Sequence, residues 1–439
     1  MSHAVAPAAR PRQGTALALT ILALVLSVGA YTLVGLGRRG NVPIGLALYG
    51  SVFTLGYVAT HLAMRRLAPL ADPALFPTAG VLTGLGFAMI FRLSGGLAAE
   101  QSTWIAVGLL AFVGVLLVVR DHRQLDAYTY TIGFLGLALL LLPIVPGIGR
   151  AINGARLWVR IGPMGFQPSE IGKVLIVVFL ASYLSAKREL LSVTSGRLGP
   201  LRLPPAKHLA PVLFAWGASL AVLFLQKDLG ASLLYFGIFV VMLWVATGRT
   251  AYLIIGLVLF AIGAGVAYAV LDHVQQRVDI WLHALDPGKV FDLGYGQVAQ
   301  AQFGMATGGL VGAGLGRGSP GLIPFASTDF IFAAIGEELG LLGTTAVLLL
   351  FVTLVGKGLK TALECPDAFG KLLAAGLSAS LGLQAFVIAG GVTRVIPLTG
   401  VTLPFVSYGG SSLVSNFILL ALLVRISSGP AKRRAERVT

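Results

Sequence analysis

Long apolar runs, separated by short polar segments, recur along the whole chain. A helix needs about 20 apolar residues to cross the hydrocarbon core of a bilayer, so each run is a candidate transmembrane helix. The pattern predicts about twelve spans, at roughly 15–36, 44–64, 77–91, 103–119, 127–145, 167–186, 208–225, 229–247, 250–271, 329–355, 370–391 and 401–425. We therefore expect an all-α, polytopic integral membrane helix bundle.

Composition supports this class. The chain has 439 residues, of which 56% are hydrophobic and 11% charged, whereas soluble domains carry about 25% charged residues. The net charge of +15 fits cytoplasmic loops rich in Lys and Arg, so we expect no nucleic-acid partner. A single cysteine, Cys365, allows no internal disulfide. The six histidines are scattered, and we expect no metal-binding Cys/His cluster.

Loop charges predict the orientation in the membrane. The first run, 15–36, is longer than the ~7–15 apolar residues of a signal peptide, so we expect a retained helix. Placing both termini in the cytoplasm puts most of the 32 Lys and Arg residues there. Two segments then lie outside, 146–166 and 271–328. Because long loops are usually functional or disordered, the second predicts an ordered cap over an outward-facing cavity, with short amphipathic pieces around Trp281, Phe291 and Tyr295.

Ionisable residues inside or at the edge of apolar spans are costly, so each is a candidate functional group. Glu170 and Lys173 are three residues apart, on one helix face, and are able to pair. Asp228 lies in a short polar turn between two spans. The alternatives are structural: an ion pair that only stabilises a helix start, and an aspartate that only caps the next helix.

Three further acids follow the long outer segment. Asp329 lies where that segment meets a span, and helix capping is the alternative to a catalytic role. Glu337 and Glu338 come next, with Glu337 about 12 Å deeper in a straight helix that rises ~1.5 Å per residue. Two adjacent acids at that depth are hard to explain by folding alone.

The segment 393–412 carries two prolines and three glycines at membrane depth. Irregular backbone is tolerated there only where it is buried in protein or lines a watery cavity, and its free N–H groups can bind an anion. Close helix packing through small residues is the alternative. Together these segments place acids, cations and broken helix near the outer side of one bundle, which suits a lipid-linked anionic substrate.

The motifs and their order resemble those of the SEDS family (shape, elongation, division and sporulation), the RodA/FtsW/SpoVE peptidoglycan glycosyltransferases. The resemblance covers roughly 77–426 and rests on the stretch 153–173, the turn Gln226–Gly230, the segment Gly308–Gly316, the motif Thr328–Gly340 and the segment Thr402–Ser412. Family members typically have ten spans, and the two extra N-terminal ones resemble RodA-like proteins of actinobacteria. Thr399 stands where many division-type members carry lysine, which favours the elongation branch.

The resemblance implies three regions: an extra transmembrane helix pair at 1–70, a glycosyltransferase membrane domain at 71–426 that includes the large extracytoplasmic loop 271–328, and a basic cytoplasmic tail at 427–439. It places the protein in the bacterial cytoplasmic membrane, with an extracytoplasmic active site.

The implied reaction is polymerisation of lipid II into glycan strands, with inversion and release of undecaprenyl pyrophosphate, during cell elongation or division. The resemblance marks Asp329 as catalytic, and we interpret it as the general base that a poor hydroxyl nucleophile needs. Cations, among them Arg156, Lys173 and Arg394, or a divalent ion such as Mg²⁺ or Mn²⁺, would stabilise the leaving pyrophosphate. The predicted substrate-binding or cavity residues are Arg156, Gln167, Glu170, Lys173, Asp228, Thr328, Arg394, Ser407 and Tyr408.

The competing interpretations are a flippase for lipid II and a purely scaffolding role. Charges and broken helices also occur in transporters, but no matching pair of Gly/Pro-interrupted segments recurs in two halves. No Ser-x-x-Lys transpeptidase motif occurs either, so peptide crosslinking would come from elsewhere. The expected partners are lipid II and the growing glycan strand, a class B penicillin-binding protein, elongasome or divisome proteins, and membrane lipid.

Overall fold

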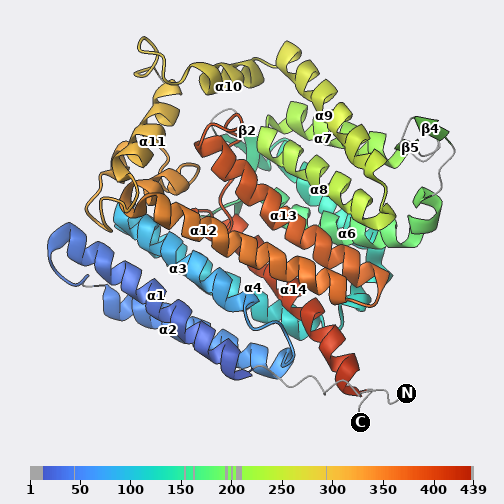
Figure 1. Cartoon of the computed structure of the whole chain (residues 1–439), viewed down its shortest axis with the longest axis horizontal. Coiled ribbons are helices and arrows are strands. Elements are labelled where there is room, and N and C mark those ends of the chain that lie inside the picture. The colour runs from blue at the N-terminus through green and yellow to red at the C-terminus, as the bar shows by residue number, and fades with distance from the viewer. Residues whose placement is uncertain are drawn as a thin grey trace.

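The computed structural model describes residues 13–43, 45–152, 155–161, 164–192, 196–198, 201–203, 210–292 and 294–436. Its helices form one bundle (Figure 1). They are α1 (Gln13–Arg39), α2 (Leu46–Leu67), α3 (Leu75–Leu93), α4 (Gly95–Val118), α5 (Thr129–Leu141), α6 (Pro168–Ser192), α7 (Ala210–Gln226), α8 (Leu229–Thr247), α9 (Thr250–Val270), α10 (Asp272–His283), α11 (Tyr295–Gly308), α12 (Ile331–Glu364), α13 (Ala368–Val392) and α14 (Gly410–Glu436), with short 3-10 helices η1 (His122–Tyr128), η2 (Leu142–Ile144) and η4 (Pro320–Leu322).

Among the described residues, 10 helices are long and apolar enough to cross a membrane. The predicted spans 44–64 and 208–225 are present as α2 and α7, which are not counted among those 10. Helical backbone also continues through the described part of the predicted tail, because α14 runs to Glu436. The expected polytopic helical class is confirmed.

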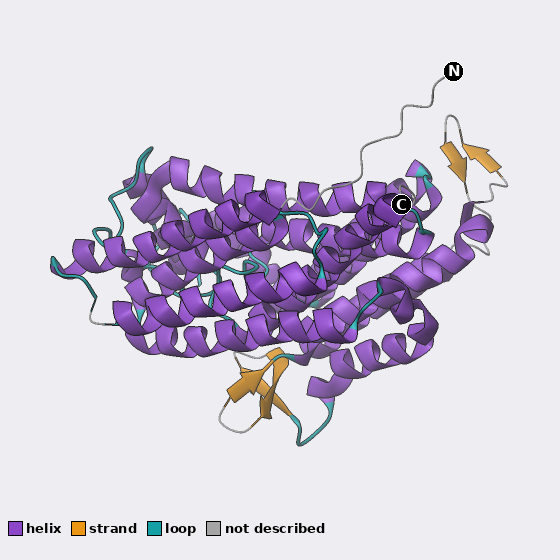
Figure 2. Cartoon of the chain, turned by 90° about the horizontal axis from the view of Figure 1, so that it is seen from below, coloured by secondary structure: helices purple, strands orange, loops and turns teal. Residues whose placement is uncertain are grey.

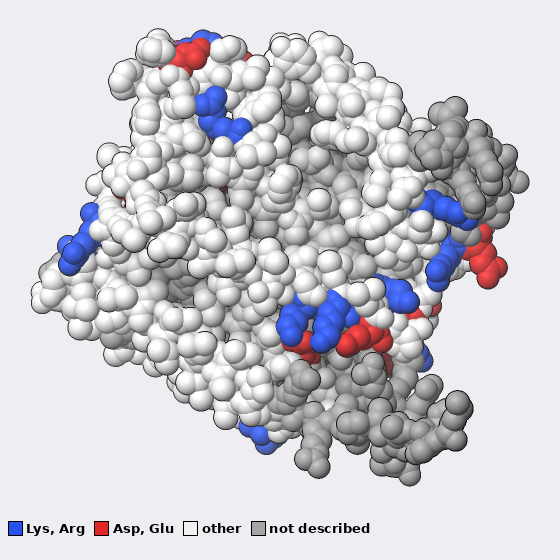
Figure 3. Space-filling model, viewed as in Figure 1, with Lys and Arg blue, Asp and Glu red and all other residues white. Residues whose placement is uncertain are grey.

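The bundle has an inner and an outer set of helices. In α3, α13 and α14, 78% of the most apolar window is buried, whereas α5 and α9 bury 17%. Apolar side chains on the outer helices therefore face outwards, as in a protein whose solvent is lipid. Figure 3 shows one face of the molecule. The charged side chains visible there lie towards the ends of the helices, and the middle of the face is uncharged, as expected for a surface in contact with lipid.

Two small antiparallel sheets project from the helical body at separate places (Figure 2). One has strands β1 (Gly149–Ile152), β2 (Ala155–Ile161) and β3 (Met164–Phe166), in that order, and the other pairs β4 (Gly196–Leu198) with β5 (Leu201–Leu203). The three-stranded sheet occupies the predicted outer segment 146–166. Residues 157–161 include Trp, Val and Ile, which are enriched in strands, and this composition would have favoured β2.

Two predicted helix boundaries differ from the structure. The last span was expected from residue 401, but α14 begins at Gly410 and the preceding backbone is irregular, with Phe405 at φ 63°. Helix α12 is interrupted at Gly340, where φ 66° and ψ −165° are not helical. The glycine-rich segment 309–316 folds against this interruption, since Leu341 donates its N–H to the Gly309 carbonyl at 2.9 Å.

The acids of α12 hold that glycine-rich segment in place. Glu338 forms an ion pair with Arg92 of α3 at 2.7 Å and accepts the Gly316 N–H at 2.9 Å, while Glu337 accepts the N–H of Ser319. The prediction that these acids are hard to explain by folding is therefore wrong. They satisfy buried donors that a bent backbone would otherwise leave unpaired.

Candidate active site

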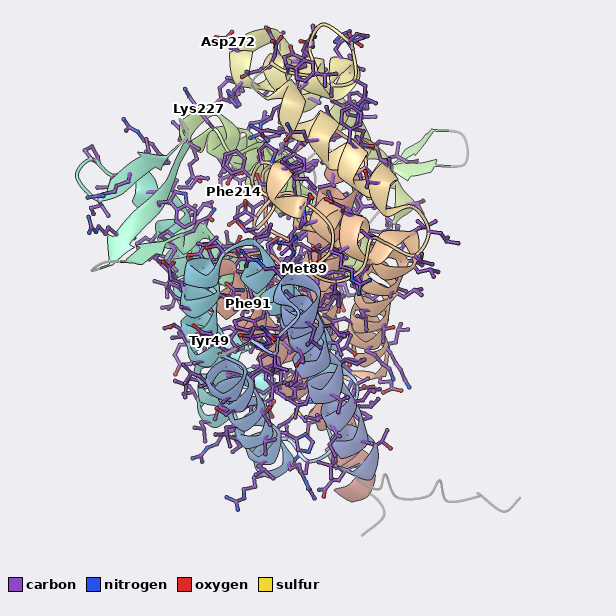
Figure 4. All side chains as sticks on the ribbon, turned by 90° about the vertical axis from the view of Figure 1, so that its left-hand side faces the viewer. Tyr49, Met89, Phe91, Phe214, Lys227 and Asp272 are labelled. Carbon is purple, nitrogen blue, oxygen red and sulfur yellow. The ribbon has the colours of Figure 1, made fainter. Side chains whose placement is uncertain are left out.

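A cavity of about 1170 Å³ opens at the end of the bundle that carries α10 and the sheet β1–β3. Figure 4 labels Lys227, which lines it, at the same end of the molecule as Asp272, the first residue of α10. The volume exceeds the roughly 300–1,000 Å³ of typical small-molecule sites, which suits a large substrate. Its ionisable lining residues are Glu100, Glu170, Lys227, Asp228, His273, Arg277, Asp329 and Tyr408.

Asp329 lies in this cavity, in the turn before α12. The N-cap of α12 is Phe330 and makes no side-chain cap bond, so the capping alternative for Asp329 is not what the structure shows. Burial raises the pKa of Asp329 to about 6, while the positive charge of Arg277 and a hydrogen bond with Thr328 lower it. A carboxylate with a pKa near neutrality is suited to accept a proton at cellular pH.

Arg277 of α10 lies near Asp329 in the cavity and was not among the predicted site residues. Its Nη1 donates to the Leu398 carbonyl at 2.6 Å. This bond fixes the guanidinium against the irregular segment between α13 and α14, residues 393–409. An ideal Cβ at Gly400 would lie 3.4 Å from Arg277 Nη2 and 3.8 Å from Asp329 Oδ2. Gly400, at φ +76°, therefore lies beside both charged groups. The distribution of Lys and Arg among the loops could not show that Arg277, rather than another basic residue of the outer segments, lies at the site.

Asp228 caps a helix and also lines the cavity. Its Oδ1 accepts the Ala231 N–H at 2.8 Å, which confirms that it caps α8. It also lines the cavity, and burial raises its pKa to about 6, while hydrogen bonds from the α8 backbone and the charge of Arg277 lower it.

Glu170 and Lys173 form the expected ion pair, at 2.9 Å between Oε2 and Nζ. Glu170 lines the cavity, whereas Lys173 is 4% exposed and lies behind it. Lys173 also donates to Gln384 Oε1 at 2.7 Å, and Gln384 Nε2 donates to the Thr402 carbonyl at 2.8 Å. The pair thus anchors the irregular segment through α13.

Four described residues other than glycine have positive φ: Lys227 (56°), Phe325 (54°), Arg394 (60°) and Phe405 (63°). All four lie in the segments that surround the cavity. Strained backbone persists only where the surrounding structure holds it, and it gathers at functional sites.

Similarity to known proteins identifies the family. A family model described as "Cell cycle protein", that of FtsW, RodA and SpoVE, matches residues 75–431. The chain is 45% identical over 438 residues to the protein named peptidoglycan glycosyltransferase RodA of Mycobacterium tuberculosis, covering 97% of this chain and 92% of that one.

The chain belongs to the FtsW/RodA/SpoVE family.

Solved structures show the same fold. A chain from a study titled "Structural coordination of polymerization and crosslinking by a peptidoglycan synthase complex" has a TM-score of 0.65 at 29% identity, over 82% of this chain and 98% of that one. The rod shape determining protein RodA of Thermus thermophilus has a TM-score of 0.56 at 26% identity, over 81% and 96%. The multi-pass helical membrane fold of the family and its enzyme class, peptidoglycan glycosyltransferase, are thereby confirmed for this chain.

Three residues predicted for the cavity of this family member act instead on its framework. Arg394 donates to the Trp281 carbonyl at 2.8 Å, and Trp281 Nε1 donates to the Arg394 carbonyl at 2.9 Å, which ties the irregular segment to the end of α10. Ser407 Oγ donates to the Thr328 carbonyl at 2.7 Å and so holds the turn that carries Asp329. Lys173, as described, lies behind the cavity wall.

The other predicted residues lie in or beside the cavity. Gln167, Thr328 and Tyr408 line it, and the Tyr408 hydroxyl bonds to the carboxylate of Glu100. Arg156 lies on β2 with an exposed side chain, next to residues 155 and 157 of the cavity wall. Among the described residues, the Lys and Arg side chains that line the cavity are thus Lys227 and Arg277.

The Glu170–Lys173 pair gives the first prediction. Because both groups are largely withdrawn from solvent, Lys173→Met or Glu170→Gln alone should lower the free energy of unfolding by about 3–5 kcal/mol, since each leaves an unpaired buried charge. The double substitution should cost less than the sum. Thermal unfolding of purified protein in detergent measures this coupling, and strictly additive losses would show that each residue acts independently.

Proposed function

We propose that this chain polymerises lipid II into glycan strands at the extracytoplasmic face of the cytoplasmic membrane, as a RodA-like enzyme of cell elongation. The observation that carries the proposal is a large cavity in which Asp329, with a pKa near 6, lies near Arg277. Such a cavity, at one end of the bundle and close to lipid, accommodates a sugar–pyrophosphate head group whose lipid tail stays in the membrane.

Asp329 is proposed as the general base. The C4 hydroxyl of the acceptor sugar loses its proton to the carboxylate while its oxygen forms a bond to C1 of the donor sugar. The bond from C1 to the pyrophosphate oxygen breaks, and the anomeric centre inverts. A base pKa near 6 keeps most of the carboxylate ionised at neutral pH without making it too weak to accept the proton.

Arg277 is proposed to stabilise the leaving pyrophosphate. The electrons of the broken C1–O bond stay on undecaprenyl pyrophosphate, whose negative charge grows in the transition state. A guanidinium held in place by the Leu398 carbonyl needs little reorganisation to meet that charge. Lys227, at the α7–α8 turn, brings a second cation to the same cavity.

A divalent cation is a further proposal for this site. Mg²⁺ in proteins is usually held by one or two carboxylates together with substrate phosphates. Asp228, Asp329 and Glu170 are carboxylates of the required kind and line the cavity. In the described part of the chain, however, the group of three ligands within 4.8 Å of one another lies elsewhere. A cation here would therefore be shared with the substrate pyrophosphate.

We also propose a class B penicillin-binding protein as the partner. The solved complex to which this chain is similar is described as one that coordinates polymerisation and crosslinking. The chain itself carries no Ser-x-x-Lys transpeptidase motif, so crosslinking requires a second protein.

The direct test is glycan synthesis in detergent. Purified protein, with and without a class B penicillin-binding partner, is incubated with lipid II, and the products are resolved on a gel. Glycan chains should form, because the substrate has no membrane to cross in a detergent micelle. Absence of glycan chains in both samples, together with transport of lipid II in vesicles, would favour the flippase.

Orientation is proposed from the loop charges and is tested by thiol labelling. In a Cys365→Ser background, a cysteine at Phe291, which is 94% exposed, should react with an impermeant reagent on intact cells. A matched cysteine at Lys360 should react only after permeabilisation, because this residue lies near the C-terminal end of α12, away from the cavity. The reverse labelling pattern would invert the proposed topology.

A further inference from the structure

Three potential metal ligands meet at the end of α12 opposite the cavity. His122 of η1, Cys365 just after α12 and Asp367 just before α13 bring their ligand atoms within 4.8 Å of one another. His122 Nε2 lies 3.1 Å from Asp367 Oδ2, and Cys365 Sγ lies 3.4 Å from the same oxygen. His122 and Cys365 are each 2% exposed. Residues that are scattered in the sequence thus meet in the fold, which the sequence analysis did not predict.

The three donor atoms converge over Gly370 in the first turn of α13. An ideal Cβ at this position would lie 2.5 Å from His122 Nε2, 2.6 Å from Cys365 Sγ and 2.9 Å from Asp367 Oδ1. Any side chain at residue 370 would thus fill the point at which the donors meet. With Zn²⁺ bonds of about 2.0–2.3 Å, tetrahedral ligands lie ~3.3–3.6 Å apart, close to the separations seen here.

The surroundings of the cluster include one competing cation, because Arg123 Nε lies 3.5 Å from Asp367 Oδ2, and two contacts that fit a metal site. The second ring nitrogen of His122, Nδ1, faces Asp121 Oδ1 at 3.4 Å. Histidines that bind metals commonly direct their other nitrogen to a carboxylate, which fixes the ring and increases its basicity. Asp367 Oδ1 is held in turn by the Gly370 N–H at 2.8 Å.

We propose that His122, Cys365 and Asp367 bind one divalent ion of the zinc class, with water as the fourth ligand. A thiolate and an imidazole favour Zn²⁺ over the harder Mg²⁺, so this site is chemically distinct from the cavity. On binding, the Cys365 thiol releases its proton to solvent and the imidazole binds in its neutral form. The ion adds metal–ligand bonds between η1 and the α12–α13 turn, at the right-hand ends of α12 and α13 in Figure 1.

Metal content is the first test. Intact protein, purified without a histidine tag and dialysed, should retain about one Zn²⁺ per chain by mass spectrometry. Cys365→Ser and His122→Gln should each bind Zn²⁺ at least about tenfold more weakly. The matched control His283→Gln changes a half-exposed histidine of α10 that pairs with Asp279, and should bind normally. Wild-type protein that retains no more Zn²⁺ than Cys365→Ser would overturn the proposal.

Cobalt substitution separates a metal site from a hydrogen-bonded cluster. Co²⁺ added to wild-type protein should give sulfur-to-cobalt charge-transfer absorption, which Cys365→Ser should lack. A chelator should lower the Tm of wild type but not that of Cys365→Ser, whose hydroxyl can still donate to Asp367. No charge-transfer band, with a chelator-insensitive wild-type Tm, would show that the three residues only hydrogen-bond. The wild-type spectrum decides the matter even if a variant fails to fold.

Discussion

Replacing Asp329 with asparagine should reduce glycan synthesis by a factor of ~10²–10⁴ while leaving the protein folded and inserted in the membrane. The substitution keeps the shape of the side chain and removes its charge and basicity. The structure excludes a capping role, because the N-cap of α12 is Phe330, so little stability should be lost. Gel-resolved product from purified protein and lipid II gives the rate, and detergent-extracted yield and Tm report folding.

Two companion variants sharpen this test. Asp292→Asn changes an exposed aspartate of the same outer segment and should polymerise normally. Asp329→Glu should be impaired, because moving the carboxylate by about 1 Å can cost on the order of a hundredfold. Robust synthesis by Asp329→Asn would refute the general-base assignment and direct attention to Asp228 or Glu170.

Arg277→Gln should lower glycan synthesis by a factor of ~10²–10³, because it removes a fixed positive charge aimed at the developing pyrophosphate. It should also change the pH dependence. A general base works only when deprotonated, so wild-type activity should fall as the pH drops through about 6. Arg277 lowers the pKa values of Asp329 and Asp228, so its loss should move this acid limb to higher pH.

The measurement is the rate of glycan synthesis between pH 5 and 8 for wild type, Arg277→Gln and the control Arg317→Gln, an exposed arginine of the same loop. Because Asp329 and Asp228 titrate in the same range, the limb reports the pair rather than either residue. A lowered rate with an unmoved acid limb would show that Arg277 binds substrate without tuning the base.

The sequence by itself determined the membrane class, the positions of most helices and the family. Apolar runs of about 20 residues have essentially one physical solution in lipid, a helix, because backbone groups there must bond within the segment. It also located the acids Asp228, Glu170 and Asp329, since ionisable groups at the edges of such runs are rare. The structural alternatives considered for two of them, a helix cap for Asp228 and an ion pair for Glu170, are confirmed.

Only the tertiary structure decided which charged groups meet. Arg277 joins Asp329 because α10 folds over the irregular segment and is held there by Arg394, a contact across more than a hundred residues. Glu337 and Glu338 became loop anchors because Gly340 bends α12. The His122–Cys365–Asp367 cluster likewise brings together residues that are far apart in the sequence. Periodicity reports which face of a helix is buried, whereas the partner of each buried charge depends on how helices distant in sequence pack together.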